Sequence, residues 1–285
     1  MNCDLHTHST ASDGALSPTA LLERAVANGV DCLALTDHDS TDGVAELAEA
    51  ASRASEWRGE WVAGVEISAL CARLPIHVVG LWVHPDSPQL GALLERQRHV
   101  REQRAEAIAA RLAAAGMVGA LAGARQLAAA AVLSRPHFAR WLVAEGHCRT
   151  VQQAFKRWLG RGKIGDVRCE WAALDTVIDV IQAAGGHAVL AHPEKYRLSR
   201  GKLRQLIGDF AAAGGDAIEI VSGPQERADT ERLLQLAVAS ELAGSIGSDF
   251  HSPAQHWSDV GSAGRLPAAI QPVWDLPRRS AMVAP

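Results

Sequence analysis

The sequence is short of the residues that build disulfide-stabilised or thiolate-ligated proteins. It has five cysteines in 285 residues, an odd number, and no CxxC pair. These absences argue against a disulfide framework and against a zinc site made of cysteines. Hydrophobic residues make up 48% of the chain, and a chain of this length can bury a large core. We therefore expect a globular protein that folds in a reducing compartment.

Long apolar runs and the loop motifs of several enzyme classes are also missing. No stretch reaches the ~18 apolar residues that a membrane span needs, and the first residues, MNCDLH, lack the basic and apolar regions of a signal peptide. No GxSxG elbow or GK[ST] loop occurs, so acyl transfer and P-loop nucleotide binding have no support. We expect a cytoplasmic protein with no membrane partner and no obligate protein partner.

Charge is unevenly distributed along the chain. Between Glu95 and Glu170 there are fourteen Lys and Arg against six Asp and Glu, a net charge of +8. The total is −4, so the rest of the chain carries −12. An acidic body with a basic insertion fits a protein whose carboxylates hold metal and whose insertion meets an anionic ligand. A solvated helical face is the alternative reading of the same charges.

Short β-rich runs alternate with helical patterns over most of the sequence. Such alternation predicts βα units and a mostly parallel sheet, here an α/β barrel of seven strands. We expect the strands at residues 2–6, 31–36, 61–67, 76–82, 187–191, 217–222 and 244–248.

The alternation stops between residues 88 and 180, where the sequence is strongly helix-forming, as in LLERQRHVREQRAEAIAARLAAAG. We predict a discontinuous barrel domain at 1–87 and 181–285, and an all-helical insertion at 88–180 that caps the barrel mouth.

Imidazole and carboxylate side chains stand at the ends of five predicted strands. In a parallel α/β barrel, chemistry collects at these C-terminal ends. A lone His is more often structural, as we expect for His99, His147 and His187, but a shared spacing and nearby carboxylates favour metal ligation. The residues concerned are His6, His8 and Asp13 in HTHSTASD, His38 in TDHDS, Glu66 in GVEIS, His192 in AHPEK, and Asp249 and His251 in GSDFH.

The fourth strand needs a separate argument, because His77 lies at its beginning. If strands three and four form a hairpin that turns near Cys71–Ala72, Glu66 lies opposite residues 77–78. Cross-strand neighbours are ~5 Å apart, so His77 can share a metal with Glu66. His84 is a weaker candidate.

Five motifs in this order resemble those of the PHP (polymerase and histidinol phosphatase) family of metal-dependent phosphoesterases. They are DLHTHSTASDG at 4–14, LTDHD at 35–39, GVEIS at 64–68, AHP at 191–193 and GSDFH at 247–251. The resemblance spans about residues 2–260. It implies a distorted seven-stranded β/α barrel, (β/α)7, that holds up to three metal ions.

The resemblance also implies how the ligands are shared. His6, His8, Glu66 and Asp249 would bind one metal; Glu66, His77 and His192 a second; and Asp13, His38 and His251 a third. All of these except His77 are the expected catalytic residues. Mixed imidazole and carboxylate ligands suit Mn²⁺, Fe²⁺ or Zn²⁺. We expect two or three divalent ions per chain, and Mn²⁺ is the expected metal, with Fe²⁺ and Zn²⁺ as alternatives.

The helical insertion and SRPHFAR at 134–140 resemble a subgroup, the bacterial 3′,5′-nucleotide bisphosphate phosphatases, also described as 5′-to-3′ exoribonucleases acting on short RNA. The resemblance implies a nucleotide substrate, and short RNA as a second one. Arg135 and His137 are expected to bind substrate, since Arg can hold a phosphate by two hydrogen bonds; Lys195 and Arg197 are weaker candidates. Histidinol-phosphate phosphatase and a non-catalytic metal-binding accessory module stay open as alternatives.

Overall fold

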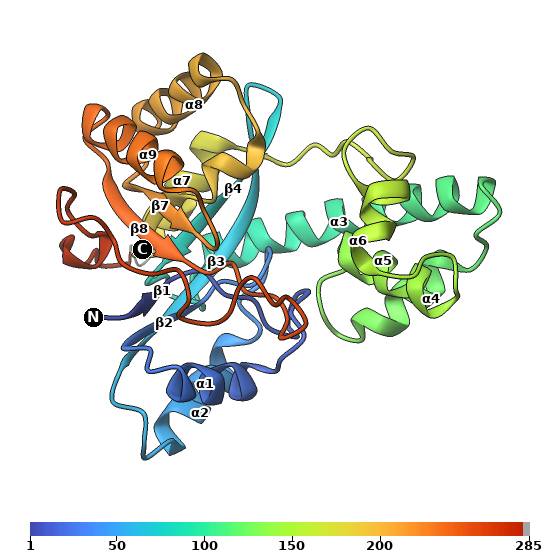
Figure 1. Ribbon diagram of the computed structural model, residues 1–285, viewed down its shortest axis with the longest axis horizontal. Helices are drawn as coiled ribbons and strands as arrows, with labels where there is room; N and C mark the ends of the chain where they lie inside the picture. Colours follow the sequence, from blue (N-terminus) through green and yellow to red (C-terminus); the bar gives the residue numbers. More distant parts are fainter. Residues whose placement is uncertain (282–285) are drawn as a thin grey trace. The chain divides into compact units, whose positions relative to one another are not determined.

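The structure is a computed structural model that describes residues 1–281 (Figure 1). Its centre is a mixed sheet in which seven strands follow the order β1-β2-β3-β4-β6-β7-β8. The strands are β1 (Cys3–Asp4), β2 (Cys32–Leu35), β3 (Glu60–Cys71), β4 (Leu74–Leu81), β6 (His187–Leu190), β7 (Ala217–Ser222) and β8 (Ala243–Gly247). Each lies within or overlaps a predicted strand. A two-residue strand, β5 (Ala172–Ala173), pairs with β3 outside this order and was not predicted.

The two edges of the sheet meet through backbone hydrogen bonds. Leu5 donates its N–H to the carbonyl of Ile246, and His8 donates to Phe250, both at 3.0 Å. Asp249 donates back to His6 at 2.9 Å. The sheet thus nearly closes into a barrel, which confirms the predicted seven-stranded α/β fold, and it brings the ends of β1 and β8 together.

The barrel is distorted because β4 runs antiparallel to both of its neighbours, β3 and β6. The predicted hairpin is present, but its turn is at Ala72–Arg73, where both residues have positive φ (45° and 70°). This turn pairs Ser68 with His77 and Glu66 with Val79. The prediction that Glu66 lies opposite residues 77–78 is therefore wrong, because a later turn shifts the register.

Five helices belong with the barrel: α1 (Pro18–Ala27), α2 (Val44–Arg53), α7 (Leu174–Ala183), α8 (Arg200–Ala212) and α9 (Arg227–Ala239). The start of α1 shows how the sequence sets a helix boundary. Ser17 caps it by accepting the N–H of Ala20, and Pro18 occupies the first turn. Apolar side chains of the strands and of α7 and α8 form the largest buried cluster. Two short 3₁₀ turns, η2 (Pro193–Tyr196) and η3 (Val273–Asp275), complete this part.

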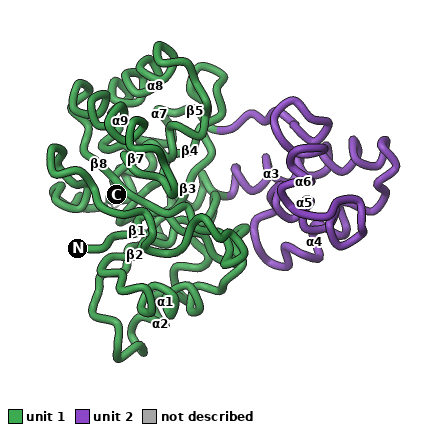
Figure 2. Tube along the Cα trace, in the orientation of Figure 1, with its two compact units in different colours: residues 1–94, 172–285 green, residues 95–171 purple. Residues whose placement is uncertain are grey.

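The chain divides into two compact units (Figure 2). The barrel unit comprises residues 1–94 and 172–285, of which 282–285 lie outside the described residues, and the helical unit comprises 95–171. The helical unit contains most of α3 (Pro88–Ala114), α4 (Ala120–Ala128), α5 (Arg135–Ala144), α6 (Val151–Ala154) and η1 (Phe155–Leu159), a π-helical turn. It has an apolar core of its own.

The helical unit is shorter than the insertion expected at 88–180. The first turns of α3 bury Leu90, Leu93 and Leu94 in the barrel core, and α7 buries Ile178 and Ile181 there. These segments therefore pack as parts of the barrel unit, although they flank the insertion in the sequence. Among residues 1–281, no helix combines the length and the apolar character that crossing a membrane requires.

Candidate metal centre

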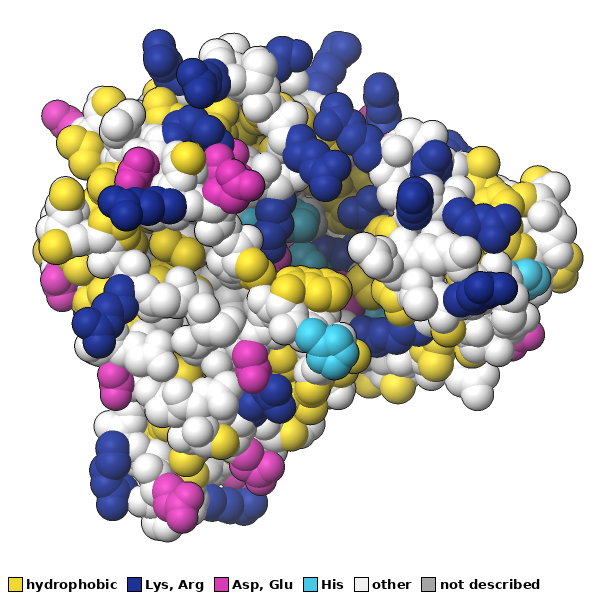
Figure 3. All heavy atoms as spheres, in the orientation of Figure 1, with side chains coloured by type: hydrophobic (Ala, Val, Ile, Leu, Met, Phe, Trp, Pro, Cys, Tyr) yellow, Lys and Arg dark blue, Asp and Glu magenta, His cyan; other side chains and the backbone are white. Residues whose placement is uncertain are grey.

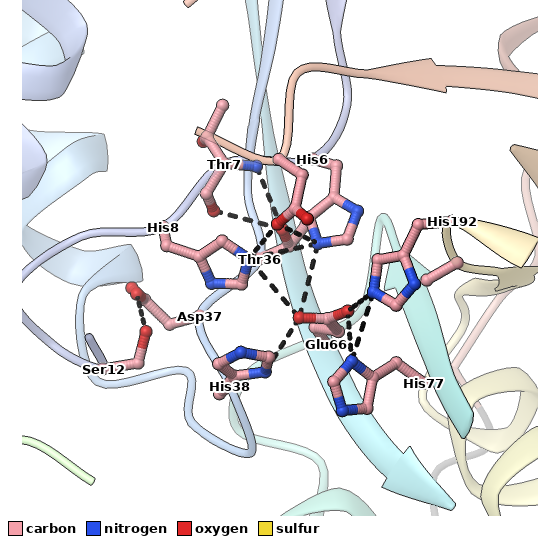
Figure 4. A network of polar contacts seen from close by, with 12 residues as sticks. His6, Thr7, His8, Ser12, Thr36, Asp37, His38, Glu66, His77 and His192 are labelled. Carbon is pink, nitrogen blue, oxygen red and sulfur yellow. Dashed lines mark hydrogen bonds and ion pairs between the residues drawn. The ribbon is translucent and has the colours of Figure 1, made fainter. Parts of the chain in front are cut away.

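The nine predicted ligands lie together in the barrel unit, and Figure 4 labels six of them, five histidines around the carboxylate of Glu66. His6 and His8 follow β1, with Asp13 in the next loop; His38 follows β2, and His192 follows β6. Glu66 and His77 lie within β3 and β4, and Asp249 and His251 follow β8. Parallel strands bring their carboxyl ends to one end of a barrel, so the topology collects residues that are distant in the sequence.

Glu66 is the centre of this cluster. Its side chain is fully buried, and its Oε1 lies 2.8 Å from Nδ1 of His77 and 2.9 Å from Nε2 of His192. Its other oxygen, Oε2, lies 2.8 Å from Nδ1 of His38 and 3.3 Å from Nε2 of His6. One carboxylate therefore faces imidazoles on both sides, which is the arrangement of a ligand that bridges two ions.

A second group surrounds Asp249. Its Oδ1 lies 3.2 Å from Nε2 of His8 and 3.6 Å from Nε2 of His6. These two histidine nitrogens are 3.1 Å apart. Ligand atoms of His6, His8 and Asp249 all fall within 4.8 Å of one another, a separation that one ion can span.

A third group lies around Asp13, which is buried. Nε2 of His251 is 3.3 Å from Asp13 Oδ1, and Nε2 of His38 is 3.8 Å from Oδ2. His8 also reaches this group, and its ring stacks on that of His251 with 4.1 Å between centroids. His8 thus lies between the first and third groups, which the resemblance assigns to separate ions.

The ligand atoms of the cluster, imidazole nitrogens and carboxylate oxygens, suit divalent cations. Buried Oε2 of Glu66 accepts no hydrogen bond from the described residues, although two imidazole nitrogens are near it. Nε2 of His6 faces Nε2 of His8 at 3.1 Å. If the proton of His6 is on Nδ1, beside Glu219, its Nε2 has a lone pair that faces the carboxylate oxygens of Glu66 and Asp249, which are acceptors as well. Converging acceptors of this kind call for positive charge among them.

The pKa values divide the ligands into two kinds. Although burial opposes it, nearby carboxylates raise the pKa of His6 well above its usual value and that of His251 to about 9. The pKa values of Glu66 and His8 are instead shifted toward the forms that bind metal. Although burial opposes it, neighbouring histidines such as His77 and His38 hold the pKa of Glu66 well below its usual value. Burial, reinforced by the adjacent His251, lowers the pKa of His8 to about 3. Glu66 is thus an anion and His8 a neutral imidazole near neutral pH, which are the forms that bind metal ions.

The backbone at the site is held in conformations that most residues avoid. His192 has φ 31° and Asp249 has φ 52°, and such strain is typical of functional positions. Gly247, in the GSDFH motif, has a different role: a Cβ there would lie 2.3 Å from Cβ of His6. Only glycine therefore lets the end of β8 approach this histidine.

Comparison with known proteins identifies the family. The family model described as PHP domain matches residues 4–117. A 5′-3′ exoribonuclease of Haemophilus influenzae is 45% identical over 95% of this chain and 97% of its own. A 3′,5′-nucleoside bisphosphate phosphatase of Chromobacterium violaceum is 43% identical over 96% of this chain and 95% of its own. This chain belongs to the PHP family.

A solved structure shares the fold of this chain over nearly its full length. An amidohydrolase of Chromobacterium violaceum, solved with bound sulfate and without metal, has a TM-score of 0.89 and 42% identity. The similarity covers 96% of this chain and 95% of that one. The sequence motifs, the barrel and the nearly full-length similarity therefore all lead to one family.

One buried carboxylate of this PHP site, Glu219, is not among the predicted residues. Glu219, in β7, lies 2.5 Å from Nδ1 of His6 through its Oε1, and its Oε2 accepts the backbone N–H of His192 at 2.6 Å. It orients two predicted ligands from different strands. The signal that could have found it is a single charged residue in the apolar strand AIEIVS.

Other buried polar residues hold the loops that carry the ligands. Asp37 accepts hydrogen bonds from the N–H and hydroxyl of Ser9 and from the hydroxyl of Ser12, at 2.6–2.7 Å. Tyr196, the only tyrosine, accepts the N–H of His77 at 2.8 Å and donates to the carbonyl of Ala191 at 3.0 Å. The ligand positions are thus fixed by neighbours as well as by strand ends.

The predicted substrate residues fall in two places. Lys195, in η2, is exposed but contacts a carboxylate oxygen of Asp249 and so lies at the cluster. Arg197, two residues later, is exposed as well. Arg135 and His137 are the first and third residues of α5 in the helical unit. His137 is buried, and its Nδ1 accepts the N–H of Ser134 at 3.1 Å in a capping box. This gives His137 a structural role in addition to the one predicted.

The three histidines expected to be structural, His99, His147 and His187, are not among the candidate metal ligands within residues 1–281. His99 is exposed and lies 2.9 Å from the side chain of Gln103. His187 begins β6 and lies beside Asp216, at 3.9 Å. Trp141 and Trp158 pack in the core of the helical unit, and His147 lies with its ring 5.5 Å from that of Trp141.

Proposed function

We propose that this PHP protein is a metal-dependent phosphoesterase that removes the 3′-phosphate of 3′,5′-nucleoside bisphosphates and leaves the 5′-mononucleotide. Digestion of short 5′-phosphorylated RNA from its 5′ end is the second activity. The observation that carries the proposal is the cluster of nine histidines and carboxylates, in which Glu66 is common to two of the ligand groups. The names of relatives that are 43–45% identical over nearly the full chain supply the substrate class.

The residues present fit two or three divalent ions, and Mn²⁺ is the ion we propose. His6, His8, Glu66 and Asp249 would hold the first; Glu66, His77 and His192 the second; and Asp13, His38 and His251 the third. Bound there, such ions supply hydroxide at neutral pH and stabilise the attacking and leaving oxygens of phosphoryl transfer.

The chain itself contributes orientation and charge. Glu219 favours the proton of His6 on Nδ1 and leaves Nε2 free to face Asp249 and Glu66. Lys195 brings a positive charge to Asp249, where it can bind an oxygen of a phosphate monoester. Arg135 and Arg197 are proposed contacts of the second phosphate. A substrate with two phosphates then gains binding energy that positions the reacting one.

The test is a panel of phosphate esters incubated with the Mn²⁺-loaded protein. We expect 3′,5′-adenosine bisphosphate to be hydrolysed far faster than 3′-AMP, with 5′-AMP and phosphate as the products on chromatography. His6→Ala, which removes a buried candidate ligand, serves as the inactive control. Accumulation of adenosine, or faster hydrolysis of histidinol phosphate, would contradict the proposed substrate and favour the alternative phosphatase.

A further inference from the structure

The helical unit carries an exposed basic surface formed by Lys156, Arg157, Arg161, Lys163 and Arg168, which we name the 156–168 surface. All five side chains are exposed. Within residues 1–281, none of them forms an ion pair with an Asp or Glu; the one contact of their charged groups is that of Arg157 with the adjacent Trp158 ring, 5.6 Å from its centroid. Exposed arginines elsewhere, such as Arg53, Arg125 and Arg227, do pair with carboxylates. Other exposed cations, such as Arg200 and Arg204 of α8, also have no ion pair among the described residues. The 156–168 surface is distinguished by having five such cations within thirteen residues.

The backbone below this surface is ordered by contacts of its own. Gly165 donates its N–H to the carbonyl of Trp158 at 2.8 Å, and the carboxylate of Asp166 accepts the N–H of Gly162 at 2.8 Å. Arg111 of α3 donates to the carbonyl of Ile164 at 3.1 Å. Lys156 and Arg157 thus lie in the π-helical turn η1, Arg161 and Lys163 in the folded turn that follows it, and Arg168 just beyond.

The sequence GRGKIG at 160–165 has the spacing GxGxxG, so a dinucleotide loop must be considered. That motif binds pyrophosphate where it follows a strand and opens a helix. Here it follows η1 and leads into a turn without a strand on either side. The segment therefore offers side-chain charge and not a Rossmann phosphate loop.

The charge of the whole unit points to a polyanion. The helical unit has fourteen Lys and Arg against six Asp and Glu, whereas the rest of the chain is acidic. On the face drawn in Figure 3, Lys and Arg side chains outnumber Asp and Glu over this unit. A nucleoside bisphosphate has only two phosphates, which are too few to contact five further cations that have no carboxylate partner. A phosphodiester chain adds one negative charge with every nucleotide.

We propose that the 156–168 surface binds the phosphate backbone of a single-stranded RNA. This inference rests on the proposed function only in that RNA is one of the substrates; binding by the surface does not require hydrolysis. The surface would contact the RNA through long, exposed Lys and Arg side chains that bind phosphates and do not read bases. Binding is therefore independent of base sequence and strongly dependent on salt concentration. The surface thereby favours RNA over mononucleotides.

The test compares two variants that each remove four exposed positive charges. The first is Lys156→Gln/Arg157→Gln/Arg161→Gln/Lys163→Gln, and the matched control, in the barrel unit, is Arg200→Gln/Lys202→Gln/Arg204→Gln/Arg265→Gln. Affinity is measured on the Mn²⁺-loaded protein by fluorescence anisotropy. The probe is a 5′-phosphorylated oligoadenylate of about 12 nucleotides with nuclease-resistant 2′-O-methyl phosphorothioate linkages.

We expect the first variant to bind the probe roughly tenfold or more weakly at moderate salt, with a log–log salt slope reduced by about 0.7 for each phosphate that is no longer neutralised. The control variant should bind the probe as tightly as the parent does. The first variant should hydrolyse 3′,5′-adenosine bisphosphate at the parent's rate. Equal binding by the parent and the first variant, an equal loss in the control, or no binding by the parent would overturn the inference. A parent that binds the probe but spares the bisphosphate would instead count against the proposed function alone.

Discussion

At the scale of single residues, the chemistry of the site depends on carboxylates that are not themselves predicted ligands. Glu219 is 1% exposed and contacts His6 and the backbone of His192. A carboxylate beside the far nitrogen of a ligating imidazole sets its tautomer and raises its basicity. Glu219 is therefore a positioning residue for two groups of ligands that come from different strands.

Glu219→Gln should weaken metal binding while leaving the fold intact, because the amide keeps the shape but loses the charge. We expect roughly a 10–100-fold loss of Mn²⁺ affinity, measured by chelator competition and checked by metal content after purification. Glu231→Gln on the exposed face of α9 is the control. Unchanged affinity in Glu219→Gln would show that the contact with His6 is structural.

Arg135 is the second residue whose role can be tested alone. If it binds the second phosphate of the substrate, Arg135→Ala should lower kcat/KM for 3′,5′-adenosine bisphosphate by several-fold to a hundred-fold, since a charged hydrogen bond contributes about 1–3 kcal/mol. Hydrolysis of a generic aryl phosphate should fall much less. Equal losses on both substrates would mean that Arg135 supports the helical unit at the start of α5 and not substrate binding.

The sequence was sufficient to predict which residues gather, but not how their neighbours hold them. His6, His38 and Asp249 could be predicted because strand ends meet in any parallel barrel. Glu219 is marked only by its charge in an apolar strand, and its role could not be predicted, since a residue in mid-strand faces either side depending on register. The hairpin register was missed because Ala72 and Arg73, with positive φ, give no glycine or asparagine signal of a turn.

At the scale of elements, the segment after η3 is tied to the barrel by a bidentate ion pair of Arg279, in addition to the contacts of Arg278 with Glu60 and the Trp82 ring. Arg279 donates to Oδ1 and Oδ2 of Asp216 at 2.7 and 2.9 Å, and it also lies 2.8 Å from His187. Asp216 in turn accepts the N–H of Ala188 at 2.9 Å, at the edge of β6. Burial opposes the charge of Asp216, but the nearby His187 and the hydrogen bonds from Arg279 keep its pKa below the usual value.

This depressed pKa has a definite consequence for stability against pH. A carboxylate with a lower pKa in the folded state contributes stability above its unfolded pKa of about 3.9, and that contribution is lost as the pH falls below it. Arg279→Met should therefore lower the free energy of unfolding by about 1–3 kcal/mol near neutral pH. In urea titrations, the difference from the parent should shrink as the pH falls below about 4. A difference that is constant with pH, or equal in the exposed control Arg265→Met, would contradict this role.

At the scale of the whole molecule, the two units divide chemistry and charge between them. All nine predicted ligands are in the barrel unit, whereas the helical unit has a separate apolar core and a net positive charge. A ligand that binds only the folded state stabilises it by mass action. Metal should therefore stabilise the unit that contains its ligands and have little direct effect on the other.

Hydrogen exchange measured with and without Mn²⁺ tests this division. Removal of metal by a chelator should speed amide exchange around β1, β6 and β8, because it withdraws a stabilisation of about 2.7 kcal/mol at a metal concentration of 100 times Kd. Exchange in α4 and α5 should change little, since their core contains no candidate ligand. The control is His6→Ala, in which metal should protect the barrel strands less. Equal protection of α4, α5 and the barrel strands by metal would show instead that the two units unfold as one cooperative body.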